Sequence, residues 1–69
     1  MAKTAQASKL TSREREILRL VRRGYRDREI AGNLSLSLST VATRLRNISR
    51  KLEARDRLEL AMLAARLDP

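Results

Sequence analysis

Between Leu38 and Leu52 the chain carries arginine, asparagine and hydroxyl side chains but no acidic residue. Arginine forms paired hydrogen bonds with guanine, asparagine does so with adenine, and small or hydroxyl residues allow a helix to approach a groove closely. On a helix, these side chains gather at about 100° to 240° from the apolar stripe. The residues expected to face DNA bases are Ser39, Ala42, Thr43, Arg46, Asn47 and Arg50.

Two more basic residues of this stretch, Arg44 and Lys51, lie to one side, at about 280° to 300° from the stripe. This position suits contacts with the phosphate backbone. An isolated run of charge is more often a solvated surface. The absence of acids and the presence of small residues favour DNA here, although the division between base and phosphate contacts stays open.

The opposite side of the same stretch is apolar. Val41, Leu45, Ile48 and Leu52 fall within about 60° of one another on an ideal helix. We therefore expect a helix over residues 38–52 that packs on a core through one narrow stripe.

The segments before this helix predict two others. Thr11 and Glu14 have the spacing of a capping box, and Gly24 suits a left-handed helix end, so a first helix is expected over residues 12–23. A second helix is expected over residues 27–34, capped by Asp27, with Arg26 as the alternative start.

A three-residue turn at residues 35–37 follows, in which Leu36 is expected to pack inward and Ser37 to cap the next helix. The alternation of Leu and Ser here also fits a strand, but the helical pattern that follows argues against one. A short helix, a tight turn and a longer helix make a helix-turn-helix, whose second helix enters the major groove of DNA.

A fourth helix is expected from the Asp56-x-x-Glu59 pattern to about Leu67. It is apolar on two faces, and a four-helix domain covers one of them. One face holds Leu58, Ala61, Met62 and Ala65. The other was assigned to a homodimer interface and holds Leu60, Leu63, Ala64 and Leu67.

The composition agrees with a polyanionic partner. The net charge is +8, from 16 basic and 8 acidic residues, and 13 of the basic residues are arginine. The chain has no cysteine and no histidine, so we expect no catalytic residue, no metal site and no cofactor. No apolar run approaches about 18 residues, so we expect a cytoplasmic protein without membrane contact. The helix caps and turns specify a folded domain rather than an amphipathic membrane peptide.

Sixty-nine residues suffice for one domain. We assign residues 1–9 to a flexible N-terminal tail or linker remnant and residues 10–69 to the domain. The expected fold class is all-α, a four-helix bundle containing a helix-turn-helix with its third helix as recognition helix.

A series of residues now shows a family resemblance: the run LTSREREIL at residues 10–18, Gly24, Glu29-Ile30-Ala31, Leu34, Ser37-x-x-Thr40-Val41, Asn47-Ile48, Lys51-Leu52 and Arg55-Asp56-Arg57. Over about residues 10–65 the chain resembles the LuxR/FixJ-type (GerE-like) helix-turn-helix domain. The resemblance implies a bacterial transcription regulator whose third helix reads double-stranded DNA and whose fourth helix dimerises. By position it implies groove contacts from Ala42, Thr43 and Arg46, and a backbone contact from Arg55.

Four residues depart from the family pattern. Ala42 replaces a common lysine, so one contact is lost or altered. Arg44 replaces a common histidine, so that the run around it also resembles region four of sigma factors. This second likeness keeps open an adaptor that binds RNA polymerase through the fourth helix. Glu53 replaces a glycine and is expected to extend the third helix, while Ser35 replaces a turn glycine and is expected to be mildly strained.

Overall fold

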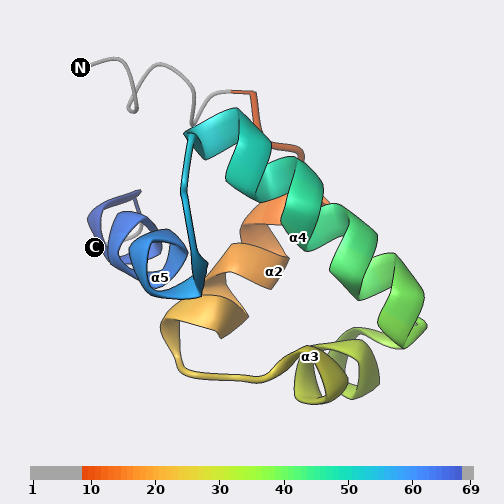
Figure 1. Cartoon of the computed structure of the whole chain (residues 1–69). Helices are drawn as coiled ribbons and strands as arrows, with labels where there is room; N and C mark the ends of the chain where they lie inside the picture. The colour runs from red at the N-terminus through yellow and green to blue at the C-terminus, as the bar shows by residue number, and fades with distance from the viewer. Residues whose placement is uncertain (1–8, 68–69) are drawn as a thin grey trace.

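Four helices make up the part of the chain that the computed structural model describes, residues 9–67 (Figure 1). The expected tail, apart from Lys9, lies outside the described residues. No strand occurs within residues 9–67, so the predicted all-α class is confirmed. The helices are α2 (Ser12–Arg22), α3 (Asp27–Leu34), α4 (Leu38–Leu52) and α5 (Arg57–Leu67).

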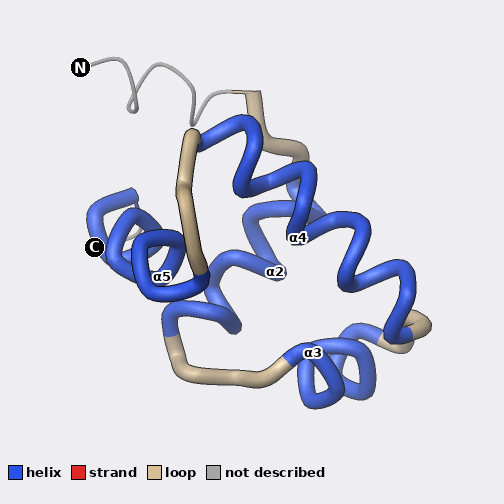
Figure 2. The backbone as a smooth tube through the Cα atoms, viewed as in Figure 1, coloured by secondary structure: helices blue, strands red, loops and turns tan. Residues whose placement is uncertain are grey.

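The helices enclose one apolar core. The orange α2 packs mainly on α5 and α4, and α3 packs on α4, which crosses in front of α2 in Figure 1. Short loops join the helices, and the longest straight segment connects α4 to α5 (Figure 2). The largest side chains that are essentially inaccessible to solvent are Ile17, Ile30, Val41, Ile48, Leu52 and Leu60.

Helix α2 begins at the predicted capping box. The Thr11 hydroxyl accepts a hydrogen bond from the Glu14 amide at 3.1 Å, and the Glu14 carboxylate accepts one from the Thr11 amide at 2.9 Å. Both amides would otherwise lack a partner at the helix start. The helix ends at Arg22, one residue before the predicted end.

Gly24 ends α2 in the predicted left-handed conformation, with φ of +88°. The Tyr25 amide donates to the Leu20 carbonyl at 3.0 Å, and the Gly24 amide donates to the Val21 carbonyl at 2.9 Å. These two bonds form a Schellman motif, which satisfies carbonyls that the last helical turn leaves open. The motif directs the chain toward α3.

The preferred cap of α3, Asp27, is wrong by one residue, and the alternative start at Arg26 is correct. Arg26 is the N-cap, and its amide donates to the Glu29 carboxylate at 2.8 Å. The Glu29 carboxylate therefore satisfies the amide of Arg26, while no side-chain cap hydrogen bond forms at this helix start. Asp27 instead lies in the first helical turn and pairs with Arg57 of α5.

The turn between α3 and α4 follows the prediction. Ser35 is left-handed, with φ of 57°, and the Leu36 amide donates to the Ala31 carbonyl at 2.9 Å. The Leu36 side chain is partly buried against the core. Ser37 caps α4 by accepting a hydrogen bond from the Thr40 amide at 3.1 Å. The turn therefore fixes both helix ends that border it.

Helix α4 ends at Leu52, and the expectation that Glu53 extends it is wrong. Glu53 adopts the left-handed conformation, with φ of 57°. The Ala54 amide then donates to the Ser49 carbonyl at 2.9 Å, as in a Schellman motif. The backbone keeps the conformation that glycine prefers even though a side chain occupies the position.

The two glycines offer a matched test of backbone conformation. A methyl group at either Gly24 or Gly32 would meet no atom within 4 Å. We expect Gly24→Ala to destabilise the domain by about 1 kcal/mol, because an L-residue resists positive φ. Gly32→Ala, within α3, should stabilise it by roughly 0.5–1 kcal/mol. Urea unfolding followed by circular dichroism measures both, and shifts of the same sign would contradict this account.

Candidate nucleic-acid interface

The outward face of α4 is formed by the residues expected to face bases. The helix is held by its apolar stripe, in which Val41 and Ile48 are fully buried. The opposite side is therefore directed to solvent. On it, Ser39, Ala42, Thr43, Arg46 and Arg50 are exposed and Asn47 is half-buried. The structure thus places all six residues on the surface of one helix.

A shallow depression of about 380 Å³ lies on this helix toward its N-terminal half. Arg44 lines it and is half-buried, and its Nε atom is buried without a hydrogen-bond partner. A buried guanidinium nitrogen without a partner is unusual, because losing its water is not compensated. The residues that line the depression are Ser39, Thr40, Thr43, Arg44 and Asn47.

Hydroxyl groups order the N-terminal turn of α4. Ser37 Oγ donates to Thr40 Oγ1 at 2.7 Å and lies 3.2 Å from Ser39 Oγ. The first turn contains no acidic residue. Since the amides of a helix start carry partial positive charge, this end of α4 is compatible with a nearby anion.

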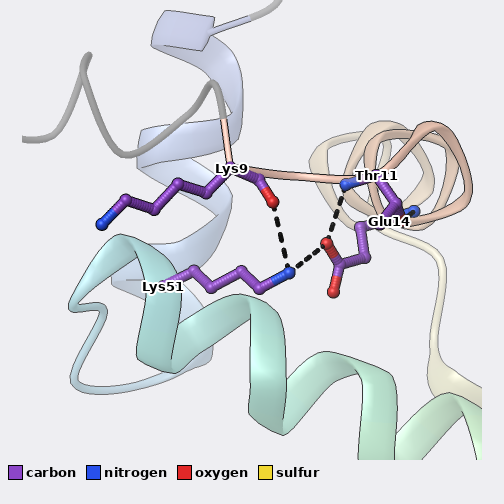
Figure 3. A network of polar contacts seen from close by, with 4 residues as sticks. All are labelled: Lys9, Thr11, Glu14 and Lys51. Atoms are coloured by element: carbon purple, nitrogen blue, oxygen red, sulfur yellow. Dashed lines mark hydrogen bonds and ion pairs between the residues drawn. The ribbon is translucent and has the colours of Figure 1, made fainter.

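Lys51 was assigned to the DNA backbone, but the structure turns it inward (Figure 3). Its Nζ atom lies 2.8 Å from Glu14 Oε1 and donates to the Lys9 carbonyl at 3.3 Å. The Glu14 oxygen also accepts the Thr11 amide, so one buried carboxylate joins both partners. A phosphate contact by Lys51 would require this ion pair to break.

Arg55 is oriented differently, since its side chain is 88% exposed beside the start of α5. Its amide donates to the Glu59 carboxylate at 2.7 Å, and its guanidinium lies 3.6 Å from the same group. A pair this exposed is weak, so the arginine can exchange it for a phosphate. The DNA-backbone contact expected of Arg55 from the sequence stays a prediction.

Arg57 joins α5 to the helix-turn-helix. Its guanidinium donates to the Asp27 carboxylate at 2.6 Å and to the Tyr25 carbonyl at 2.8 Å. Because two guanidinium nitrogens bind two different acceptors, the orientation of the Arg57 side chain is fixed as well as its distance from them. The bridge therefore holds the start of α3 against the start of α5.

Comparison with known proteins identifies this arrangement. The family described as bacterial regulatory proteins, luxR family, matches residues 8–64. The chain belongs to the luxR family. The match places it among DNA-binding domains of transcription regulators rather than among enzymes.

Two relatives illustrate the family. The chain is 53% identical over 51 residues to the monoamine regulon transcriptional regulator of Klebsiella aerogenes, covering 74% of this chain and 22% of that protein. It is 44% identical over 55 residues to the response regulator protein VraR of Staphylococcus aureus (strain COL), covering 80% of this chain and 26% of that protein. The chain thus spans about a quarter of the length of these relatives.

In this luxR-family domain, the residues assigned to a dimer interface form part of the core, and that assignment is wrong. Leu60, Leu63 and Ala64 are between 1% and 5% exposed, and Leu67 is partly buried against them. Leu60, Leu63 and Ala64 pack inside the domain, so they are not available to a second copy. The exposed apolar side of α5 is the other one, where Leu58 is 71% and Met62 is 55% exposed.

Within residues 9–67, no three acidic side chains come together in a way that could hold a metal ion. None of the helices described there has the length and apolar character needed to cross a membrane.

The Glu14–Lys51 ion pair was missed from the sequence, where Glu14 was assigned to helix capping alone. A signal was present, because Glu14 shares the core face of α2 with Ile17, Leu18 and Val21. A carboxylate on a core face needs a buried cationic or hydrogen-bonding partner. The identity of that partner, 37 residues away, could not be inferred from local spacing.

Glu14 also makes stability depend on pH. Burial raises the pKa of its carboxyl group, but the hydrogen bonds from Lys51 and Thr11 and the charge of Lys51 outweigh burial and hold the pKa below its usual value. A lowered folded-state pKa stabilises the fold above about pH 4.3, the value of an unfolded glutamate, and this contribution is lost as pH falls further.

We therefore expect the urea midpoint to drop on acidification from about pH 5 to about pH 3, and to drop less in Glu14→Gln. The difference between the two proteins isolates Glu14 from the other carboxylates. Identical pH profiles would show that the ion pair does not stabilise the fold.

Proposed function

We propose that this domain binds specific sites in double-stranded DNA, with α4 in the major groove, and so regulates transcription. The observation that carries the proposal is the outward face of α4, where base-reading and small side chains are exposed together and no acidic residue intervenes. The family of regulatory proteins to which the chain belongs supports the same function. Response-regulator and regulon-regulator relatives support a role in transcription control.

Base contacts are assigned to the middle of α4. Arg46 and Arg50 lie one helical turn apart and can each bind a guanine edge with two hydrogen bonds. Asn47 can bind adenine, and Thr43 and Ala42 allow close approach or contact a thymine methyl group. Ser39 reaches the same face from the first turn.

Phosphate contacts are assigned to the two sides of this helix. Arg44 is half-buried and lines the depression together with hydroxyl side chains, so its guanidinium can take part in a phosphate contact there. Arg55 can exchange its exposed ion pair with Glu59 for an ion pair with a DNA phosphate. Lys51 is left out of this set because Glu14 already binds it.

Selection of bound sequences from random duplex DNA tests the proposal. We expect enrichment of one motif of a few base pairs per domain, and an affinity for it that falls with salt by about 0.9 logarithmic units per neutralised phosphate. Binding with the same salt dependence but without any enriched motif would overturn the specific docking of α4.

We further propose that the domain forms a homodimer through the exposed side of α5. Leu58 and Met62 protrude there, and a depression of about 690 Å³ next to Leu58 is lined by apolar surface of Val21, Tyr25 and Ala61. A two-fold interface requires a surface that is complementary to itself. A protruding leucine beside an apolar depression meets this requirement when two copies face each other.

The combined substitution of Leu58→Glu and Met62→Glu should convert the dimer into a monomer, because four carboxylates would then meet in an apolar interface. Sedimentation velocity without DNA measures the change. Leu38→Glu provides the control, since Leu38 is the third large apolar residue that is exposed among residues 9–67 and belongs to α4. Equal dissociation in both proteins, or a monomeric wild type, would contradict an α5 dimer.

A further inference from the structure

The Glu14–Lys51 ion pair is a charged contact that ties the DNA-facing helix to α2. Lys51 is the penultimate residue of α4, and Glu14 lies in the first turn of α2. The Glu14 side chain is 6% exposed and the Lys51 side chain 32%. The pair also includes the carbonyl of Lys9 and the amide of Thr11 (Figure 3). Four residues from two distant segments thus converge on one ammonium group and one carboxylate oxygen.

The position of Lys51 on α4 gives this pair a mechanical effect. The apolar stripe that seats α4 is narrow, and apolar burial is non-directional, so it specifies which side of the helix is buried but not an exact rotation about the helix axis. Lys51 projects at about 90° from the centre of that stripe. A polar contact of fixed direction at this angle opposes rolling of the helix.

Rolling of α4 would directly change the DNA-facing surface. Arg50 precedes Lys51 in the chain and Arg46 lies one turn earlier, so both turn with the lysine. The N-terminal end of α4 is already fixed by the Ser37 cap and the packing of α3. At the other end, the buried Ile48 and Leu52 pack on the core, and Lys51 adds a polar contact with α2.

We propose that Glu14 and Lys51 are positioning residues for DNA recognition, because their ion pair sets the rotation of α4 at which Arg46 and Arg50 meet the base edges. Lys51 acts through Glu14 and does not touch DNA. This inference rests on the proposed function, and it replaces the phosphate contact first assigned to Lys51.

Two substitutions that change the net charge in opposite directions distinguish a positioning effect on DNA binding from an electrostatic one. Lys51→Met removes a positive charge and keeps a long side chain, whereas Glu14→Gln removes a negative charge, keeps the shape and can still accept the Thr11 amide. A purely electrostatic effect would weaken DNA binding in the first variant and strengthen it in the second. Loss of positioning weakens specific binding in both.

The experiment measures affinity for the selected site and for an unrelated duplex over a range of salt, using the 69-residue chain at a temperature where each variant is folded by circular dichroism. We expect specific affinity to fall about tenfold in Lys51→Met and about threefold in Glu14→Gln, with little change on the unrelated duplex. The salt slope should stay unchanged in Lys51→Met. Lys51→Arg, which keeps the charge and donors, should retain affinity within about twofold.

Two results would overturn the inference. A salt slope lowered by about 0.9 in Lys51→Met, with equal losses on both duplexes, would make Lys51 a phosphate contact. Tighter specific binding by Glu14→Gln would make the pair's effect electrostatic. If Lys51→Met does not fold, Glu14→Gln decides alone, since it preserves the side-chain shape. If the wild type shows no sequence preference, the proposed function fails instead.

Discussion

Replacing Arg46 and Arg50 together by alanine is expected to lower affinity for the specific DNA site by about a hundredfold or more. Each bidentate arginine–guanine pair contributes about 1–3 kcal/mol of discrimination, and both side chains are exposed on the outward face of α4. The loss should be far larger on the selected site than on an unrelated duplex, because base contacts are absent from non-specific binding. Fluorescence anisotropy with both duplexes measures the ratio.

A matched control distinguishes the position of the two arginines on α4 from the loss of two positive charges. Arg15→Ala with Arg66→Ala removes the same two charges from exposed positions of α2 and α5. We expect this control to weaken binding to both duplexes equally and modestly, since long-range attraction does not depend on sequence. The docking of α4 would be refuted if the two double variants lost the same specific affinity.

Replacing Ile48 by alanine is expected to destabilise the domain by about 2–5 kcal/mol. Ile48 is completely buried on the inner side of α4, next in the chain to Asn47. A domain of this size has a small core, so such a loss approaches its entire stability. Much of the population should be unfolded at room temperature, as measured by urea titration and far-ultraviolet circular dichroism.

Ile48→Val serves as the control, because it removes one methyl group and should cost about 0.5–1.5 kcal/mol. Specific DNA should partly restore the folded state of Ile48→Ala, since a ligand that binds only the folded state stabilises it by mass action. A loss below 1 kcal/mol in Ile48→Ala would mean that α4 is not seated by this stripe.

The elements that the sequence predicted well have local causes. Thr11, Gly24 and Ser37 act on helix ends within a few residues of themselves, and each does what its chemistry predicts. The side of α4 that faces the core could be predicted because its apolar residues form a stripe on one side of the helix. The composition of its opposite face then identified the surface proposed for DNA.

The errors concern choices that depend on the rest of the fold. Helix α5 is apolar on both sides, so periodicity could not decide whether Leu58 or Leu60 turns inward. Only the position of α2 decides it, since α2 forms most of the packing surface for α5. Lys51 was misassigned for a similar reason, because its partner is supplied by a helix far away in the chain.

The turn at Ser35–Ser37 has a consequence for the thermodynamics of DNA binding. Hydrogen bonds already close the end of α3 and the start of α4 in the free domain. In the proposed docking, DNA meets an α4 that is already folded, and the turn before it is already ordered. The heat-capacity change of binding should then reflect only the surface buried in the contact. The larger change that coupled folding adds should be absent.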